Sequence, residues 1–323
     1  MNQAPDIDGV LIQWGDRLFY PGNRIVKVKP QPKLDGGAMR QRAAVLRERI
    51  AATVVRHAPQ VIVKVTGGGR GMKAIAAHFR YISKNGRLDI EDERGDTMRG
   101  KDALPELADD WRFGGSLIND ESEPGQRREA FNIMLSMPRG TDPLTVQKAA
   151  REFAKIELAD HKYVMVLHDH QANPHVHISV RAESKHGKRL NPRKADLHRW
   201  RETFAERLRE YGVDAEATRQ ATRGRNRNCE ALWRIKARED GRLRTRRPVV
   251  KASPQVSATW IEAGEAWMQM GRALSTSVDK ADLDLSKAIA GFVKEMSGAP
   301  SVEPSRKPNI SLEPRPSDAE LRR

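Results

Sequence analysis

The residues best suited to chemistry are four histidines within ten residues. They are four of the nine histidines in the chain: His168, His170, His175 and His177. Because side chains alternate faces along a β-strand, His175 and His177 point the same way, and His168 and His170 share a face of the preceding strand. A hairpin would bring the two pairs opposite one another. Three imidazoles converging from neighbouring strands form a divalent-metal site with open coordination positions.

Neutral imidazole accepts zinc, manganese or another transition metal, and magnesium is compatible if phosphate oxygens and water complete the shell. Asp169 is a ligand by chemistry, but strand alternation directs it away from the neighbouring histidines. The alternative is a surface hairpin whose histidines are satisfied by hydrogen bonds alone. A His-x-His pair by itself would be weak support for a metal. The further histidine seven residues upstream of His175 makes the pattern more specific.

A metal that activates phosphate needs a nucleophile, either water or a side chain, and the chain has only four tyrosines. Tyr81 is the strongest candidate because Arg80 and Lys84 flank it with positive charge, which favours a phenolate and attracts a phosphate. His78 lies one helical turn before it. The competing interpretation is a tyrosine half-packed on a helix. The other three have ordinary settings in an apolar helix stripe, a strand and an irregular segment: Tyr211, Tyr163 and Tyr20.

The glycine run at 67–69 follows an apolar β-branched segment and precedes a helical one. Such a loop at a helix N-terminus can cradle a phosphate. It lacks the Gly-Lys-Ser/Thr ending of a P-loop, so nucleotide hydrolysis is disfavoured. A plain turn between strand and helix is the favoured interpretation.

The remaining pattern predicts elements that could position these groups. Apolar periodicity and turn residues predict an α+β fold with a central antiparallel sheet and flanking helices. The expected strands span 61–65, 88–93, 130–137, 163–167 and 176–180. The expected helices span 39–57, 72–84, 102–111, 144–158, 195–211, 257–274 and 280–296.

The charge balance points to a polyanionic partner. There are 58 Lys and Arg against 43 Asp and Glu, a formal net charge of +15. Residues 184–247 hold 20 of the basic and 9 of the acidic residues. No apolar run reaches the roughly 18 residues needed to cross a bilayer, so no membrane span is expected. The single cysteine, Cys229, rules out an internal disulfide and any multi-cysteine zinc site, and a reducing cytoplasm is the expected compartment.

Changes in composition divide the chain into four regions. Residues 1–36 are punctuated by proline and glycine and are expected to form a basic flexible arm. Residues 37–222 would form the catalytic domain, and 223–296 an Arg-rich and helical C-terminal region. Residues 297–323 carry five prolines and are expected to be a disordered tail.

The histidine segment resembles the third motif of conjugative relaxases, the HUH-type DNA-nicking transesterases. It is most similar to the Vir/RP4-type (MOB-P-like) mobilisation group, whose motif runs His-x-Asp, four residues, then His-x-His. His168, His175 and His177 match this pattern, and His170 stands where the family usually has Asp. The stretch Tyr81-Ile82-Ser83-Lys84-Asn85-Gly86 is similar to the family's first motif, and Ser136 to the serine of its second. The resemblance covers about residues 60–222.

The resemblance implies a mechanism on an HUH relaxase-like palm. A divalent metal, Mg²⁺ or Mn²⁺ with Zn²⁺ as an alternative, would sit on His168, His175 and His177. Tyr81 would attack the scissile phosphate of single-stranded DNA at an origin of transfer, giving a 5′-phosphotyrosine link and a free 3′-hydroxyl. His170 would be the orienting base, a fourth ligand, or neither. The residues expected to contact DNA are Ser136, Arg80, Lys84, Arg219, Arg223, Arg225 and Arg227.

The family also implies partners. Relaxosome accessory proteins, a type IV coupling protein and export to a recipient cell attached to DNA are the expectations. A rolling-circle replication initiator would share the chemistry, with replication in place of a secretion system. An accessory protein with a structural metal would hold DNA without cutting it. Formation of a covalent protein–DNA adduct separates the enzymes from the accessory protein.

Overall fold

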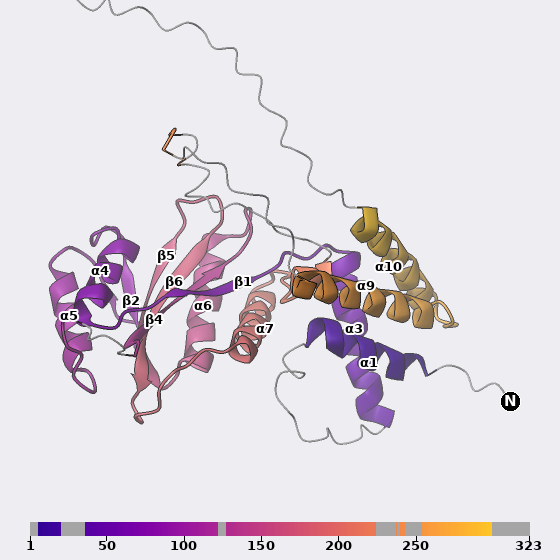
Figure 1. The fold of residues 1–323 in the computed structure, drawn as a ribbon, viewed down its shortest axis with the longest axis horizontal. Helices are drawn as coiled ribbons and strands as arrows, with labels where there is room; N and C mark the ends of the chain where they lie inside the picture. The colour runs from indigo at the N-terminus through magenta and orange to yellow at the C-terminus, as the bar shows by residue number, and fades with distance from the viewer. Residues whose placement is uncertain are drawn as a thin grey trace, which may run out of the picture.

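The structure is a computed structural model that describes residues 6–20, 36–121, 127–223, 237, 240–242 and 254–298. It contains a sheet domain and, beside it, a helical group drawn from both ends of the described chain (Figure 1). The α+β class and the antiparallel sheet predicted from the sequence are confirmed. Among the described residues, no helix is both long and apolar enough to cross a membrane.

The sheet has six strands, all paired antiparallel, in the order β1-β4-β6-β5-β2-β3. Their bounds are β1 Ile62–Gly67, β2 Ile90–Asp92, β3 Thr97–Met98, β4 Ala130–Ser136, β5 His161–His168 and β6 His175–Ser184. The helices of this domain are α4 Met72–Ile82, α5 Ala103–Phe113, α6 Pro143–Glu157 and α7 Lys194–Glu210. A short 3₁₀ turn, η1 Ala221–Arg223, follows them.

Helices cover the two faces of the sheet differently. On one face, Val176, Ile178 and Leu135 pack under Phe153 of α6 and Trp200 of α7 in the main core. This burial orients every second residue of β4, β5 and β6 toward α6 and α7. On the other face, α4 and α5 cover Val164, Val166 and Ala130 in a smaller core. The alternate side chains of β6, including His175 and His177, therefore share the face of the sheet with α4.

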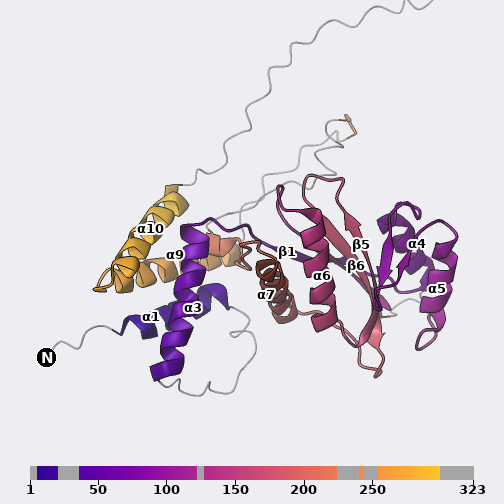
Figure 2. The ribbon, with the colours of Figure 1, turned by 180° about the vertical axis from the view of Figure 1, so that it is seen from behind.

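The helical group consists of α1 Ile7–Phe19, α3 Gly36–Val54, α9 Pro254–Leu274 and α10 Lys280–Gly298. Trp267 of α9 is fully buried at its centre, with its ring 5.8 Å from Phe19 and 5.3 Å from Phe292. Its indole N–H donates to the carbonyl of Thr222 at 2.7 Å, which ties η1 to this core. The view from behind shows α7 lying between this group and the sheet (Figure 2).

The expected flexible arm is wrong for the described part of residues 1–36. Asp6 caps α1 by accepting the Gly9 N–H at 3.0 Å, and the helix buries Leu11, Leu18 and Phe19 against α3 and α9. Helix α3 also belongs to this apolar core, so the packing does not separate the chain at residue 37. The two predicted C-terminal helices are present, and the predicted tail beyond residue 298 lies outside the described residues.

Candidate functional site

The glycine loop closes the start of α4 and leaves no room for a phosphate. A Cβ on Gly68 would lie 2.2 Å from the carbonyl oxygen of Ala130, so this position requires glycine. The first N–H groups of α4, from Met72 and Lys73, donate to backbone carbonyls of the 119–120 segment at 2.9 and 3.0 Å. These donors are the ones that an anion at a helix N-terminus would use. The loop is therefore a structural turn, as the sequence favoured.

The other end of α4 is fixed by three consecutive residues with positive φ: Lys84 at 50°, Asn85 at 58° and Gly86 at 77°. A side chain on Gly86 would also collide with Gly100, whose carbonyl oxygen lies 2.3 Å from the Cβ position. The chain therefore stops being helical immediately after Tyr81 and Ile82. This tight end places the tyrosine on the last turn of α4, facing the strands that carry the histidines.

Strands β5 and β6 form the hairpin that the histidine spacing predicts. His168, the last residue of β5, lies directly opposite His175, the first residue of β6. His177 follows on the same face, and all three rings are buried, with 4%, 6% and 8% of their surface exposed. One nitrogen from each ring lies within 4.8 Å of the others, a separation that a single metal ion can bridge.

Backbone carbonyls orient two of the rings from behind. His168 Nε2 lies 2.7 Å from the carbonyl oxygen of Ile82, and His175 Nδ1 lies 2.9 Å from that of Asn173. A carbonyl only accepts, so the proton of each neutral ring is on that nitrogen and the lone pair is on the other. The Nδ1 atoms of His168 and His177 are buried without a hydrogen-bond partner among the described residues. Buried imidazole nitrogens without a partner, in rings that lie within reach of one ion, fit a metal site.

Burial keeps the imidazoles of His168 and His177 in the form that binds metals. It lowers the pKa of His177 to about 3, with smaller contributions from the neighbouring imidazoles of His168 and His175. Burial also lowers the pKa of His168, against the opposing effect of the hydrogen bond to Ile82. Neutral rings at neutral pH can coordinate a cation without first releasing a proton.

Tyr81 lies beside this cluster. Its ring centroid is 6.3 Å from that of His177, and its side chain is 69% exposed. The fold thus brings together the expected nucleophile and the expected metal ligands, which approach from α4 and from the β5–β6 hairpin. The phenol faces solvent on one side, from which a strand of DNA could approach.

His78 is a member of the site to which the sequence assigned no role. Its ring stacks against Tyr81, with centroids 6.1 Å apart, and meets the edge of His177 at 6.4 Å. Its Nε2 is buried without a hydrogen-bond partner among the described residues, and burial lowers its pKa to about 4. The signal was its spacing of three residues from Tyr81, which puts both on one side of a helix.

The remaining expected site residues on the hairpin side occupy different positions. His170 lies beyond the end of β5, is exposed, and has its ring 5.1 Å from that of His168. Ser136 pairs with His175 across β4 and β6 but is 5% exposed. Its hydroxyl lies 3.3 Å from the carbonyl of Pro174, to which it donates. Ser136 therefore shares the histidine face of the sheet, and its buried hydroxyl supports the start of β6.

The expected DNA-contacting cations divide in the same way. Arg80 and Lys84 are exposed on either side of Tyr81. Arg219 is half-buried and donates to the carbonyl of Arg17 at 3.3 Å. The structure does not place Arg223 where the sequence leads us to expect it, on an exposed surface. It is buried, and its guanidinium donates to the hydroxyl of Thr218. The other two, Arg225 and Arg227, lie outside the described residues.

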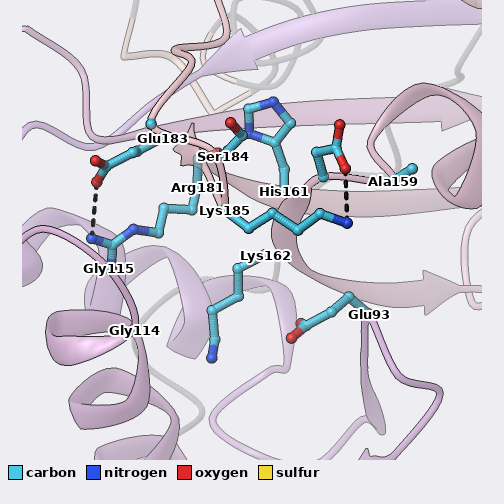
Figure 3. Close-up of a pocket in the computed structure, with 12 residues that line it drawn as sticks. Glu93, Gly114, Gly115, Ala159, His161, Lys162, Arg181, Glu183, Ser184 and Lys185 are labelled. Carbon is cyan, nitrogen blue, oxygen red and sulfur yellow. Dashed lines mark hydrogen bonds and ion pairs between the residues drawn. The ribbon is translucent and has the colours of Figure 1, made fainter.

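A separate pocket of about 340 Å³ lies at the opposite end of β5 and β6 (Figure 3). Two ion pairs lie within it: Lys185 with Asp160 at 2.8 Å, and the buried Arg181 with Glu183 at 3.6 Å. Oε2 of Glu93 is buried there without a hydrogen-bond partner among the described residues. Arg181 also donates to backbone carbonyls of Trp111 and of the loop after α5. These contacts tie that loop to β6.

Comparison with known proteins shows what part of the chain is similar to. Residues 89–213 match the family described as relaxase, MobA/VirD2-like, nuclease domain. This similarity, together with the relatives described next, supports a relaxase-like nuclease domain in the chain. The matched segment includes the whole histidine hairpin, and Tyr81 lies just before that segment.

Two curated relatives are similar to this chain. The T-DNA border endonuclease VirD2 of Agrobacterium fabrum (strain C58) is 27% identical over 183 residues, which cover 51% of this chain and 41% of that protein. The T-DNA border endonuclease VirD2 of Rhizobium radiobacter is 25% identical over 182 residues, 51% and 43% of the two chains. The chain thus matches less than half the length of these relatives.

Proposed function

We propose that this relaxase is a site- and strand-specific DNA transesterase that nicks single-stranded DNA at an origin of transfer. The observation that supports this most directly is the position of Tyr81, whose ring lies 6.3 Å from that of His177 in the three-histidine cluster. A nucleophile and a cation-binding site at this separation can engage the same phosphate. The match of residues 89–213 to a relaxase nuclease domain supports the same reaction class.

His168, His175 and His177 would hold a divalent cation, through Nδ1 of the first and Nε2 of the second. The chemistry that such a cation supplies, when bound, is neutralisation of negative charge on the non-bridging oxygens of the scissile phosphate. Three imidazole nitrogens suit Mn²⁺ or Zn²⁺, while Mg²⁺ would depend on phosphate oxygens and water for the rest of its shell.

Tyr81 would be the catalytic nucleophile. Its oxygen forms a bond to phosphorus, the bond from phosphorus to the 3′-oxygen breaks, and the 3′-oxygen takes a proton to become a hydroxyl. The phenol proton would pass to His170, whose exposed ring lies on the outer side of the cluster beside His168. The product is a 5′-phosphotyrosine that conserves the phosphodiester bond energy, so the same site can rejoin the ends.

The DNA backbone would approach Tyr81 between two exposed cations, Arg80 and Lys84. Such contacts position a strand without reading its sequence. Arg219, Arg225 and Arg227 would extend this track toward the Arg-rich segment. We further propose a cytoplasmic protein that works with relaxosome accessory proteins and a type IV coupling protein, and that leaves the cell attached to DNA.

The decisive experiment incubates the full chain with labelled single-stranded DNA from a cognate origin and Mn²⁺ or Mg²⁺. A denaturant-resistant protein–DNA adduct is expected, and peptide mass spectrometry should locate the nucleotide on Tyr81. An adduct on another residue would contradict the assignment of the nucleophile. Binding of the cognate strand without any cleavage would identify a DNA-binding accessory protein instead.

A further inference from the structure

One hydrogen bond joins the end of the tyrosine-bearing helix to the metal-binding cluster. The carbonyl of Ile82 accepts from His168 Nε2 at 2.7 Å, across 86 residues of sequence. Ile82 directly follows Tyr81, so the same peptide segment carries the proposed nucleophile and orients a proposed metal ligand. The position of this carbonyl therefore affects both halves of the site.

The carbonyl of Ile82 is available to His168 because the backbone N–H that would bond to it in a continuing helix has another acceptor. In a continuing helix, it would accept the N–H of Gly86, four residues later. That N–H donates instead to the side-chain oxygen of Ser83 at 3.0 Å, in a fully buried contact. The positive φ of Gly86 and its close approach to Gly100 hold the turn in this form.

We propose that Ser83 is a positioning residue for the metal site. By occupying the N–H of Gly86, its hydroxyl reserves the Ile82 carbonyl for His168. His168 is thereby held with its proton on Nε2 and its Nδ1 lone pair toward the cation, and Tyr81 is held alongside. The part concerning His168 is independent of catalysis, whereas the part concerning Tyr81 rests on the proposed transesterase activity.

The expected size of the effect follows from the bond that is lost. The two tautomers of a neutral imidazole are close in energy, so one ordinary hydrogen bond biases them about tenfold. Removing partners that orient metal-binding histidines typically weakens metal affinity by about 10- to 100-fold. In Ser83→Ala, the Gly86 N–H has no side-chain acceptor and competes with His168 for the Ile82 carbonyl.

The first test measures Mn²⁺ affinity of the full chain by calorimetry. Ser83→Ala is expected to bind Mn²⁺ about tenfold more weakly than the wild type. Its kcat for adduct formation should fall while KM for the DNA strand is unchanged, and Ser83→Thr, which keeps the hydroxyl, should retain both values. Thr53→Ala is the matched control, because it deletes a buried hydroxyl that only bonds within α3, and it should leave both values unchanged.

The second test measures the tautomer of His168 directly. Nitrogen chemical shifts of the His168 ring in the metal-free wild type should report a proton on Nε2, with Ser83→Ala showing a mixture of tautomers. A proton on Nδ1 in the wild type would overturn the proposal, as would Ser83→Ala with wild-type tautomer and Mn²⁺ affinity. If the wild type forms no DNA adduct but Ser83→Ala still weakens Mn²⁺ binding, the positioning role stands and the transesterase activity does not.

Discussion

The phenol ring of Tyr81 meets the imidazole of His177 edge-on, with centroids 6.3 Å apart and planes at 77°. The two rings belong to α4 and β6, which the sheet and the small core beneath α4 hold against each other. His177 is buried whereas Tyr81 is exposed, so the phenol forms the solvent side of the site. A phosphate entering from solvent would reach the tyrosine and the histidine cluster together.

Replacing the phenol oxygen tests this arrangement with little effect on folding. Tyr81→Phe should reduce adduct formation by at least about a thousandfold, because only the nucleophilic oxygen is removed. The thermal midpoint should stay unchanged, since the side chain is 69% exposed. The measurement is the yield of denaturant-resistant adduct on a labelled single strand.

Tyr211→Phe is the control for that substitution. Tyr211 caps the end of α7 and is 43% exposed, but it takes no part in the histidine cluster. It should give the wild-type yield of adduct. Equal yields from Tyr81→Phe and Tyr211→Phe would show that another residue attacks the phosphate.

Metal binding should be visible as stabilisation of the folded protein. With Mn²⁺ at about 100 times its dissociation constant, the free energy of unfolding should rise by about 2.7 kcal/mol. His175→Ala should abolish this increase because it removes one of three converging nitrogens. His186→Ala, an exposed histidine in the turn at the far end of β6, should keep it. An undiminished effect in His175→Ala would place the metal elsewhere.

Much of the site could be predicted because its signals are local. Strand alternation and the spacing of His168, His175 and His177 are enough to predict a convergent cluster once a hairpin is assumed. The charged neighbours of Tyr81 are enough to predict it as the candidate nucleophile. The link between them could not be predicted, because the contact from His168 to the Ile82 carbonyl is a backbone interaction with no side-chain signature.

The packing of the helical group could not be predicted from the sequence. The apolar residues of α9 and α10 predict helices, but nothing local says that they pack on α1 and α3 from the other end of the chain. The proline and glycine that follow Tyr20 favour an irregular segment, yet the residues before them form the short amphipathic helix α1. Leu11 and Leu18 lie on its buried side. A count of charges does not reveal burial, so the sequence could not show that Arg223 is buried.

One buried arginine contributes ion pairs to the junction between the helical group and the sheet domain. Arg49 of α3 is 7% exposed and pairs with Glu216 and, at 3.0 Å, with Glu202 of α7. Arg49→Met should lower the free energy of unfolding by about 3–5 kcal/mol, because two carboxylates remain buried without their cation. Urea denaturation measures this loss.

Arg47→Met provides the comparison for Arg49. Arg47 also pairs with two carboxylates, of Asp8 and Asp282, but its side chain is 29% exposed. The loss should therefore be smaller, about 1 kcal/mol. A double variant that also replaces Glu216 with Gln should recover part of the stability lost in Arg49→Met. Equal losses from Arg47→Met and Arg49→Met would contradict a special role for the buried pair.

His198 at the same junction should make stability depend on pH. Burial lowers its pKa to about 4, assisted by the charges of Arg201, Arg49 and Arg219. Between pH 4 and the ordinary value of about 6.5, the unfolded chain therefore carries more protons at this residue than the folded one. The free energy of unfolding should fall as pH drops through this window, by at most roughly 3 kcal/mol from His198.

The contribution of His198 is isolated by comparing denaturation of the wild type and His198→Gln between pH 4 and 7. The variant should lose stability less steeply as the pH falls, and the remaining slope comes from the other groups whose pKa values folding shifts. Parallel curves for the two proteins would show that His198 is not held in its neutral form by the fold.

Salt dependence distinguishes the exposed cations from the buried ones. Lys84 lies exposed beside Tyr81, so Lys84→Gln should remove one phosphate contact and reduce the log–log slope of affinity against salt by roughly 0.7 on single-stranded DNA. Arg223→Gln should leave the slope unchanged and lower the thermal midpoint, because Arg223 is buried against Thr218.

Lys287→Gln, an exposed lysine of α10, is the control for charge alone and should change neither quantity. Fluorescence anisotropy of a labelled single strand at several salt concentrations measures all three, and a reduced slope in Arg223→Gln alone would place the DNA along the helical junction instead of over Tyr81.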